Sequence, residues 1–224
     1  MKTLWGFGDS WGIGWGIDPA GCYTQLVGNQ LELPVKNLSI EGASMGHILY
    51  TFLDASVKFK PSDLVLVTLP PDTRGYRIYP GHALSIFSTE PGGEISPEYV
   101  SMLEHIDYSA AWFEWHHSIF QNTIISQCQE KQVTLLMQHN YGELRIIDPL
   151  RQTCKPEYYV DQNASMAEWL GGLPWDGYTL TTCGPNTNVM TTDLFLDNDT
   201  HPNEQGHKII AHRILERFNE IRNK

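Results

Sequence analysis

Apolar positions along the chain follow two alternating patterns. Short continuous apolar runs predict buried strands at 3–7, 35–38, 64–69 and 133–138. Between them, apolar residues recur every three or four positions, which predicts helices at 22–31, around 48–53, at 108–131 and from Glu204 to Ile221. Buried strands that alternate with amphipathic helices are typical of a parallel sheet covered on both faces. We therefore expect an α/β protein with a three-layer α/β/α sandwich and a mainly parallel sheet.

The loops that follow the strands are the first place to look for a site, because ligands bind beyond the carboxyl ends of parallel strands. Ser10 follows the first predicted strand, the turn at Gly42 follows the second, and Asp72 follows the third. These three loops are expected to share one edge of the sheet.

Two segments lack any clear periodicity, at about 72–107 and 158–192. Both are rich in glycine, proline and polar residues, and loops of this length are usually functional or variable insertions. The whole chain of 224 residues is of a size that one hydrophobic core can support. We therefore expect a single domain over 1–224 that carries two irregular insertions.

The balance of charges excludes some partners. The chain has 26 acidic and 15 basic residues, for a formal net charge of −11. This charge repels phosphate backbones, so no nucleic-acid partner is expected. The four cysteines are far apart and form no Cys-x-x-Cys, which argues against zinc ribbons and redox motifs. We expect free, buried thiols.

No apolar stretch is long enough for a signal peptide or a membrane span, so no membrane partner is expected. The corresponding expectation for location is the cytoplasm or export by a non-classical route. A place in a virion or a cell-surface assembly is also compatible with the sequence, and the oligomeric state is left open.

The strongest chemical signal comes from two distant triplets. Gly8-Asp9-Ser10 closes the first apolar run, and Asp199-Thr200-His201 precedes the last predicted helix. A nucleophilic serine needs a base to take its proton, and the base needs a group that orients it. The chain offers all three groups, so nucleophilic catalysis by Ser10 is the leading interpretation.

Three sequence blocks resemble those of a known hydrolase family. Phe7-Gly8-Asp9-Ser10-Trp11 resembles the first block of the SGNH hydrolases, also called the GDSL family. The stretch from Asn37 to Ser44 is similar to their second block, whose glycine is Gly42 here. His201-Pro202-Asn203-Glu204-Gln205-Gly206-His207 is similar to their last block. Gly-Asp-Ser alone is a weak signal, but the three blocks together span nearly the whole chain.

This resemblance implies a flavodoxin-like fold and ester hydrolysis without a cofactor or metal. Ser10 would attack the ester carbonyl after His201 removes its proton, and water would hydrolyse the acyl-enzyme. The backbone N–H groups of Ser10 and Gly42 would stabilise the oxyanion, which is worth about 3 kcal/mol per donor. Asp9 would hold the turn and would not be the acid of the triad.

The chain departs from the family pattern at two places. The third block normally supplies an oxyanion asparagine, but the stretch from Leu69 to Arg74 contains none. Thr73 or Arg74 is a candidate replacement, and Arg74 is equally suited to bind a substrate carboxylate or to pair with a surface acid. A catalytically weak or silent protein is compatible with this loss.

The second departure concerns the triad acid. The family pattern Asp-x-x-His would place an aspartate where this chain has Asn198. We predict Asp199 instead, because positions two apart in an extended segment project to the same side. Asp197 and Asn198 stay open as alternatives. A metal-dependent hydrolase that uses Asp197, Asp199 and His201 is a further alternative, although these residues already have a simpler role.

Other histidines and tryptophans are assigned by position. His207 and His212 fall on the last helix and are predicted to be structural. His116 and His117 do not share a helix face, so they are not a predicted ligand pair. Trp11, next to the nucleophile, is the tryptophan predicted to contact substrate.

The sequence therefore predicts a serine esterase that hydrolyses short-chain acyl esters, acetyl esters above all, of small molecules or carbohydrates. Members of the resembled family often act on acetylated sugars. The alternative is a catalytically weak or silent carbohydrate-binding or structural module on the same scaffold.

Overall fold

A parallel sheet of four strands carries the fold, as the computed structural model shows. The structure describes residues 2–70, 76–79, 82–85, 110–140, 156–161, 163–171, 192–197 and 199–222. The strands are β1 (Leu4–Phe7), β2 (Val35–Asn37), β3 (Leu64–Leu69) and β6 (Thr134–His139). They lie in the order β2-β1-β3-β6, and every pairing is parallel.

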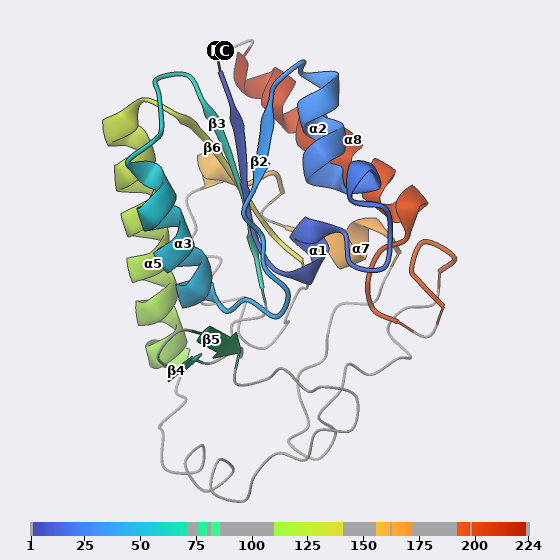
Figure 1. Ribbon diagram of the computed structural model, residues 1–224, viewed down its shortest axis with the longest axis horizontal. Coiled ribbons are helices and arrows are strands. Elements are labelled where there is room, and N and C mark those ends of the chain that lie inside the picture. The colour runs from blue at the N-terminus through green and yellow to red at the C-terminus, as the bar shows by residue number, and fades with distance from the viewer. Residues whose placement is uncertain are drawn as a thin grey trace, which may run out of the picture.

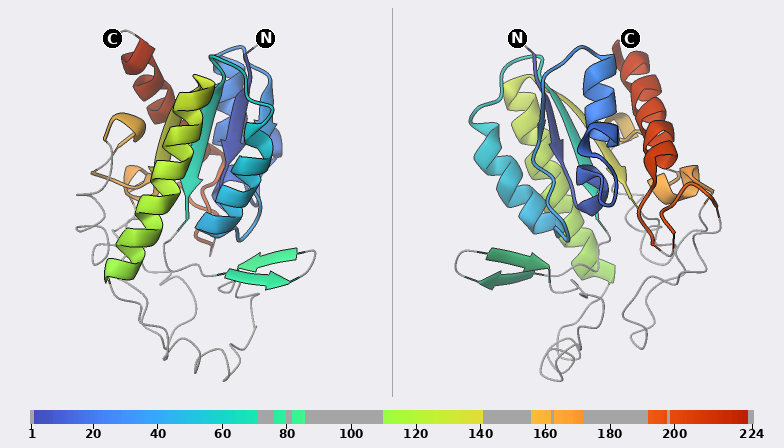
Figure 2. Two further views of the ribbon diagram at one scale, coloured as in Figure 1. Left: turned by 90° about the vertical axis from the view of Figure 1, so that its left-hand side faces the viewer. Right: turned by 45° about the vertical axis from the view of Figure 1, so that its right-hand side comes forward.

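Helices cover both faces of this sheet (Figure 1). On one face lie α3 (Met45–Ser56) and α5 (Ala110–Lys131). On the other lie α2 (Tyr23–Gln30) and α8 (Glu204–Arg222), together with two short helices, α1 (Ser10–Ile13) and α7 (Met166–Trp169). Figure 2 shows the sheet between these two helical layers. The predicted three-layer α/β/α sandwich is confirmed.

Strand β3 shows why both faces must be covered. All six of its residues are buried, and successive side chains point to opposite faces. Val65, Val67 and Leu69 pack with the core under α3 and α5. Leu64 and Leu66 pack with the core under α2 and α8. The continuous apolar run in the sequence reflects this burial on both sides.

The strand order creates a topological switch point beside β1. The chain moves from β1 to β2 on one side and then crosses back to β3 on the other. Loops that follow strands on either side of such a point diverge and leave room for a ligand. Ser10 follows β1 directly, so it lies at this point.

The segment predicted to be irregular at 72–107 contains a pair of strands that the sequence analysis did not predict. Strands β4 (Tyr76–Tyr79) and β5 (His82–Ser85) pair antiparallel. The sequence indicated only a segment rich in glycine, proline and polar residues, without clear periodicity. Most of this insertion, and of the one at 158–192, lies outside the described residues.

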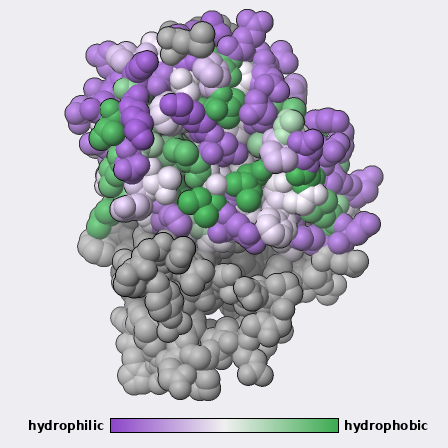
Figure 3. All heavy atoms as spheres, in the orientation of Figure 1, coloured by the Kyte–Doolittle hydropathy of each residue, from purple (hydrophilic) through white to green (hydrophobic). Residues whose placement is uncertain are grey.

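The face of the molecule drawn in Figure 3 is mostly hydrophilic among the described residues, with smaller hydrophobic areas between the hydrophilic ones. No helix in the described ranges is both long and apolar enough to cross a membrane. Cys22 and Cys128 are free and buried, as expected for these two thiols; Cys154 and Cys183 lie outside the described residues.

Candidate active site

The Gly8-Asp9-Ser10 triplet forms the junction between β1 and α1. Asp9 is the N-cap of α1, and its Oδ1 accepts a hydrogen bond from the backbone N–H of Trp11 over 3.1 Å. This is the usual way in which an aspartate fixes the start of a helix. Ser10 is therefore the first helical residue, held at the end of a buried strand. The predicted structural role of Asp9 is confirmed.

A close approach of the loop after β2 explains one glycine in α1. A Cβ atom at Gly12 would lie 2.3 Å from Ser39 Oγ, which is closer than packing allows. Asn37 reinforces this contact, because its Nδ2 donates to the Gly12 carbonyl over 2.8 Å. The helix that begins at Ser10 is thus pressed against the loop that leads to Gly42.

Ser10, His201 and Asp199 form a continuous chain of hydrogen bonds. His201 Nε2 lies 2.7 Å from Ser10 Oγ, and His201 Nδ1 lies 2.5 Å from Asp199 Oδ1. Because a carboxylate only accepts, Nδ1 carries the ring proton and Nε2 is left to accept from the serine hydroxyl. This is the relative arrangement of a nucleophile, its base and an orienting acid.

The contact between Asp199 and His201 arises from a bend and not from an extended segment. Asp199 Oδ1 also accepts the backbone N–H of His201, two residues further on, over 3.1 Å. An aspartate that binds its own backbone in this way forms an Asx-turn. The prediction of Asp199 rested on an extended segment, whereas the structure brings the same residue to His201 through a turn.

The protonation state of Asp199 suits an orienting acid. Burial raises the pKa of its carboxyl, but the hydrogen bonds and charge of His201 outweigh this effect and hold the pKa below its usual value. The group is therefore ionised at neutral pH. Of the two alternatives, Asp197 is exposed, while Asn198 lies outside the described residues.

The sequence predicted two backbone N–H groups as oxyanion donors, those of Ser10 and Gly42. The N–H of Ser10 is in the first turn of α1, where helical N–H groups have no intrahelical partner. Gly42 has a φ of 65°, a conformation that favours glycine. Neither N–H has a hydrogen-bond acceptor among the described residues. The other two predicted donors, Thr73 and Arg74, lie outside those residues.

The prediction that Trp11 contacts substrate is wrong. Its side chain has no exposed surface and packs edge-on against Phe195, with ring centroids 6.2 Å apart. The second residue of α1 points into the core, although its neighbour Ser10 faces His201. Trp15, which follows α1, is 41% exposed, and its ring centroid lies 6.3 Å from that of His201.

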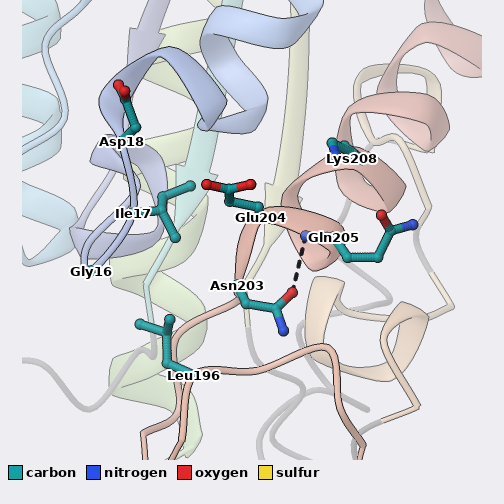
Figure 4. Close-up of a pocket in the computed structure, with 8 residues that line it drawn as sticks. All are labelled: Gly16, Ile17, Asp18, Leu196, Asn203, Glu204, Gln205 and Lys208. Carbon is teal, nitrogen blue, oxygen red and sulfur yellow. Dashed lines mark hydrogen bonds between the residues drawn. The ribbon is translucent and has the colours of Figure 1, made fainter.

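An open pocket of about 590 Å³ lies where the loop after Trp15 meets the start of α8 (Figure 4). One wall is formed by Gly16, Ile17 and Asp18. The facing residues are Leu196, Asn203, Glu204, Gln205 and Lys208. The lining combines both signs of charge with uncharged polar groups and two aliphatic side chains, so it suits a ligand that carries hydroxyl groups more than a long alkyl chain.

His207 is a structural histidine, as predicted from its place on the last helix. It is 1% exposed, its ring stacks on Tyr23, and its Nδ1 accepts the backbone N–H of Tyr23 over 3.2 Å. Burial, with a smaller contribution from the charge of His201, lowers the pKa of His207 to about 4. The contact ties the start of α2 to α8.

We expect His207 to make the fold sensitive to acid. Its pKa is about 4 in the folded chain, against about 6.5 in an unfolded one. The unfolded chain therefore takes up the proton first, and the free energy of unfolding falls by about 3 kcal/mol as the pH drops from 6.5 to 4. His207→Asn keeps an acceptor near Nδ1 and cannot be protonated, so chemical denaturation should show a flatter dependence on pH.

The matched control for this prediction is His212→Asn, because the His212 side chain is 74% exposed on the same helix. This variant should lose stability toward pH 4 as the wild type does. Parallel losses in the wild type and in His207→Asn would contradict the assignment.

Two site residues were not singled out by the sequence analysis. Asn37 binds α1 as described above. Asn140, which directly follows β6, is fully buried, and its Nδ2 donates to Asp9 Oδ2 over 2.8 Å. A polar residue at the end of a buried parallel strand was the available signal, since such positions converge on one edge of the sheet.

Comparison with known proteins identifies the fold. A member of the lipolytic G-D-S-L family from Veillonella parvula superposes with a TM-score of 0.53 at 13% identity, over 96% of this chain and 97% of that one. The esterase EstA from Pseudoalteromonas sp. gives a TM-score of 0.57 at 13% identity, over the full length of both chains. The chain has the SGNH hydrolase fold.

A third SGNH-fold structure comes from an enzyme with a named substrate. Axe2, an acetylxylan esterase from Geobacillus stearothermophilus, superposes with a TM-score of 0.52 at 15% identity, over 96% of this chain and 93% of that one. At the level of sequence, no protein-family model and no curated protein matches the chain. The SGNH fold is thus retained although little of the sequence is shared.

Proposed function

We propose that the protein is a serine esterase that hydrolyses short acyl esters, acetyl esters above all, of carbohydrates or similar polyhydroxylated alcohols. The observation that carries this proposal is the hydrogen-bonded chain from Ser10 Oγ through His201 to Asp199, with contacts of 2.7 and 2.5 Å. A serine hydroxyl is a weak nucleophile until a base removes its proton. His201 is in contact with Ser10 and stands in the tautomer that accepts this proton.

The proposed reaction has two half-reactions. Ser10 Oγ attacks the ester carbonyl while its proton moves to His201 Nε2, and the ionised carboxylate of Asp199 stabilises the imidazolium that forms. His201 then gives the proton to the departing alcohol, and Ser10 keeps the acyl group. Water, deprotonated by His201, hydrolyses this acyl-enzyme and releases the acid and free Ser10.

The oxyanion of each tetrahedral intermediate would be stabilised by the backbone N–H groups of Ser10 and Gly42. Donors of this kind are aimed before the reaction begins, so they are worth about 3 kcal/mol of barrier each. The third-block asparagine of the family is missing from this sequence, and a weaker oxyanion site is therefore part of the proposal.

The preference for carbohydrate esters rests on Trp15 and the neighbouring pocket. An exposed indole beside the base offers a flat apolar surface for a sugar ring. The adjoining pocket contributes Asp18, Glu204 and Gln205, whose oxygens accept hydrogen bonds from hydroxyl groups. The acetylxylan esterase among the structural matches acts on an acetylated carbohydrate, which is the same class of substrate.

We expect a fluorophosphonate probe to label Ser10 of the folded protein and p-nitrophenyl acetate to be a better substrate than longer esters. An enzyme built for long chains would gain about 0.8 kcal/mol of binding for each buried methylene, so its kcat/KM would rise from acetyl to decanoyl. Mass spectrometry after labelling and the ester series measure both expectations. The structure of EstA was solved with the enzyme inhibited by monoethylphosphonate, which is a precedent for this probe chemistry.

The outcomes separate the proposal from its alternative. Folded protein that stays unlabelled and still binds acetylated oligosaccharide would favour a silent carbohydrate-binding module. Labelling together with a steady rise of kcat/KM toward decanoyl would keep the hydrolase and overturn the short-chain preference.

A further inference from the structure

The carboxylate of Asp9 links α1, which carries Ser10, to the residue that follows the edge strand β6. Its Oδ1 accepts the backbone N–H of Trp11 in α1, and its Oδ2 accepts Nδ2 of Asn140, 131 positions later in the chain. Both side chains are fully buried. Each oxygen of one buried carboxylate is thus bound by a different element, so the position of Asn140 is transmitted to the turn that holds Ser10.

The backbone of Asn140 is itself fixed from two directions. Its N–H donates to the carbonyl of Leu69, the last residue of β3, over 3.1 Å. Its carbonyl accepts the N–H of Ala167 in α7 over 2.9 Å. These two backbone hydrogen bonds fix the position from which the Asn140 side chain reaches Asp9.

A buried carboxylate that loses one of its donors must turn toward another or take up a proton. Either response disturbs the cap of α1 and shifts Ser10 Oγ relative to His201 Nε2, which are 2.7 Å apart. A misplacement of about 1 Å in a reacting group can cost roughly 100-fold in rate. We propose that Asn140 is a positioning residue that, through Asp9, sets Ser10 for attack. This inference rests on the proposed hydrolase function.

The first test compares Asn140→Ala with Gln138→Ala. Gln138 is a matched control, because it is a fully buried amide on β6 that binds Ala164 and Asp161 and has no hydrogen bond to Asp9. Both variants lose a buried, hydrogen-bonded amide. Only Asn140→Ala is expected to slow fluorophosphonate labelling of the folded protein, by about 100-fold. Equal labelling rates in the two variants would overturn the proposal.

The second test exchanges the donor and the acceptor. Asn140→Asp places two carboxyl groups in contact, and such a pair must share a proton. Labelling of this variant, relative to wild type, should therefore rise as the pH falls from 9 to 6. Adding Asp9→Asn to this variant restores the hydrogen bond in the opposite direction, because the amide at position 9 donates to the carboxylate at position 140. The amide oxygen at position 9 can still accept the Trp11 N–H. Labelling at pH 8 should recover, and a double variant no faster than Asn140→Asp would contradict the positioning role.

A third measurement separates this inference from the proposed function. Hydrogen exchange of the Trp11 backbone amide reports the cap of α1 without any reaction at Ser10. It should be at least 10-fold faster in Asn140→Ala than in Gln138→Ala. If wild-type protein is never labelled, the hydrolase proposal fails while the exchange rates still decide whether Asn140 holds the turn. Unchanged exchange in Asn140→Ala would overturn the inference on its own.

Discussion

Replacement of Ser10 by alanine is expected to abolish ester turnover and to leave the fold intact. Loss of the nucleophile from a serine, histidine and acid arrangement typically costs on the order of a million-fold in kcat. The side chain is small and its Oγ contacts His201, so its removal leaves no large cavity. The measurement is kcat for p-nitrophenyl acetate, with circular dichroism and thermal unfolding as checks on the fold.

Ser56→Ala is the matched control for this experiment. Ser56 is also a buried serine, but it lies at the end of α3, where its Oγ donates to the carbonyl of Leu53 over 2.8 Å. This variant should keep wild-type turnover. A Ser10→Ala protein that retained most of its activity would eliminate the serine mechanism.

The second large effect is expected at Asp199. Asp199→Asn keeps a polar group beside His201 but removes the charge, and the amide can also present its nitrogen and so favour the wrong tautomer of the ring. Comparable changes in other serine hydrolases lower kcat by about 10⁴-fold. Because the pKa of Asp199 lies below its usual value, its carboxylate in the wild type stays ionised over the whole pH range of the measurement. The measurement is kcat across pH 5 to 9.

Asp197→Asn and Asn198→Ala test the alternatives for the triad acid. Asp197 is exposed, so its neutralisation should change kcat by less than about threefold, as is usual for an isolated surface charge. A large loss only at Asp197 or Asn198 would refute the assignment to Asp199. Small effects in all three variants would mean that Ser10 and His201 act as a dyad.

The sequence predicted the layers of the fold because buried parallel strands leave a strong signal. The apolar run 64–69 coincides with β3, since burial on both faces leaves apolar side chains at every position except the buried Thr68. The hairpin of β4 and β5 was missed because its strands are short and lie in a segment rich in glycine and proline. A short pair of strands that forms a sheet of its own carries little hydrophobic periodicity.

The sequence indicated which residues come together where a residue type has a narrow chemical use, and it did not indicate the direction in which a side chain points. Gly-Asp-Ser and a distant histidine indicated a nucleophile and a base, and the structure brings Ser10 and His201 into contact. Trp11 was misplaced because adjacency in sequence does not give the direction of a side chain in a one-turn helix. Asn140 was missed because an asparagine at a strand end is common and its partner is 131 residues away.

The two groups in contact at the proposed site are made at very different times during translation. Ser10 and His201 are separated by 191 positions, and His201 lies just before α8, which packs beside α2 on one face of the sheet. A growing polypeptide on the ribosome therefore carries Ser10 long before His201 is made. The ester hydrolysis proposed above requires the segment that carries His201 to have been made and docked.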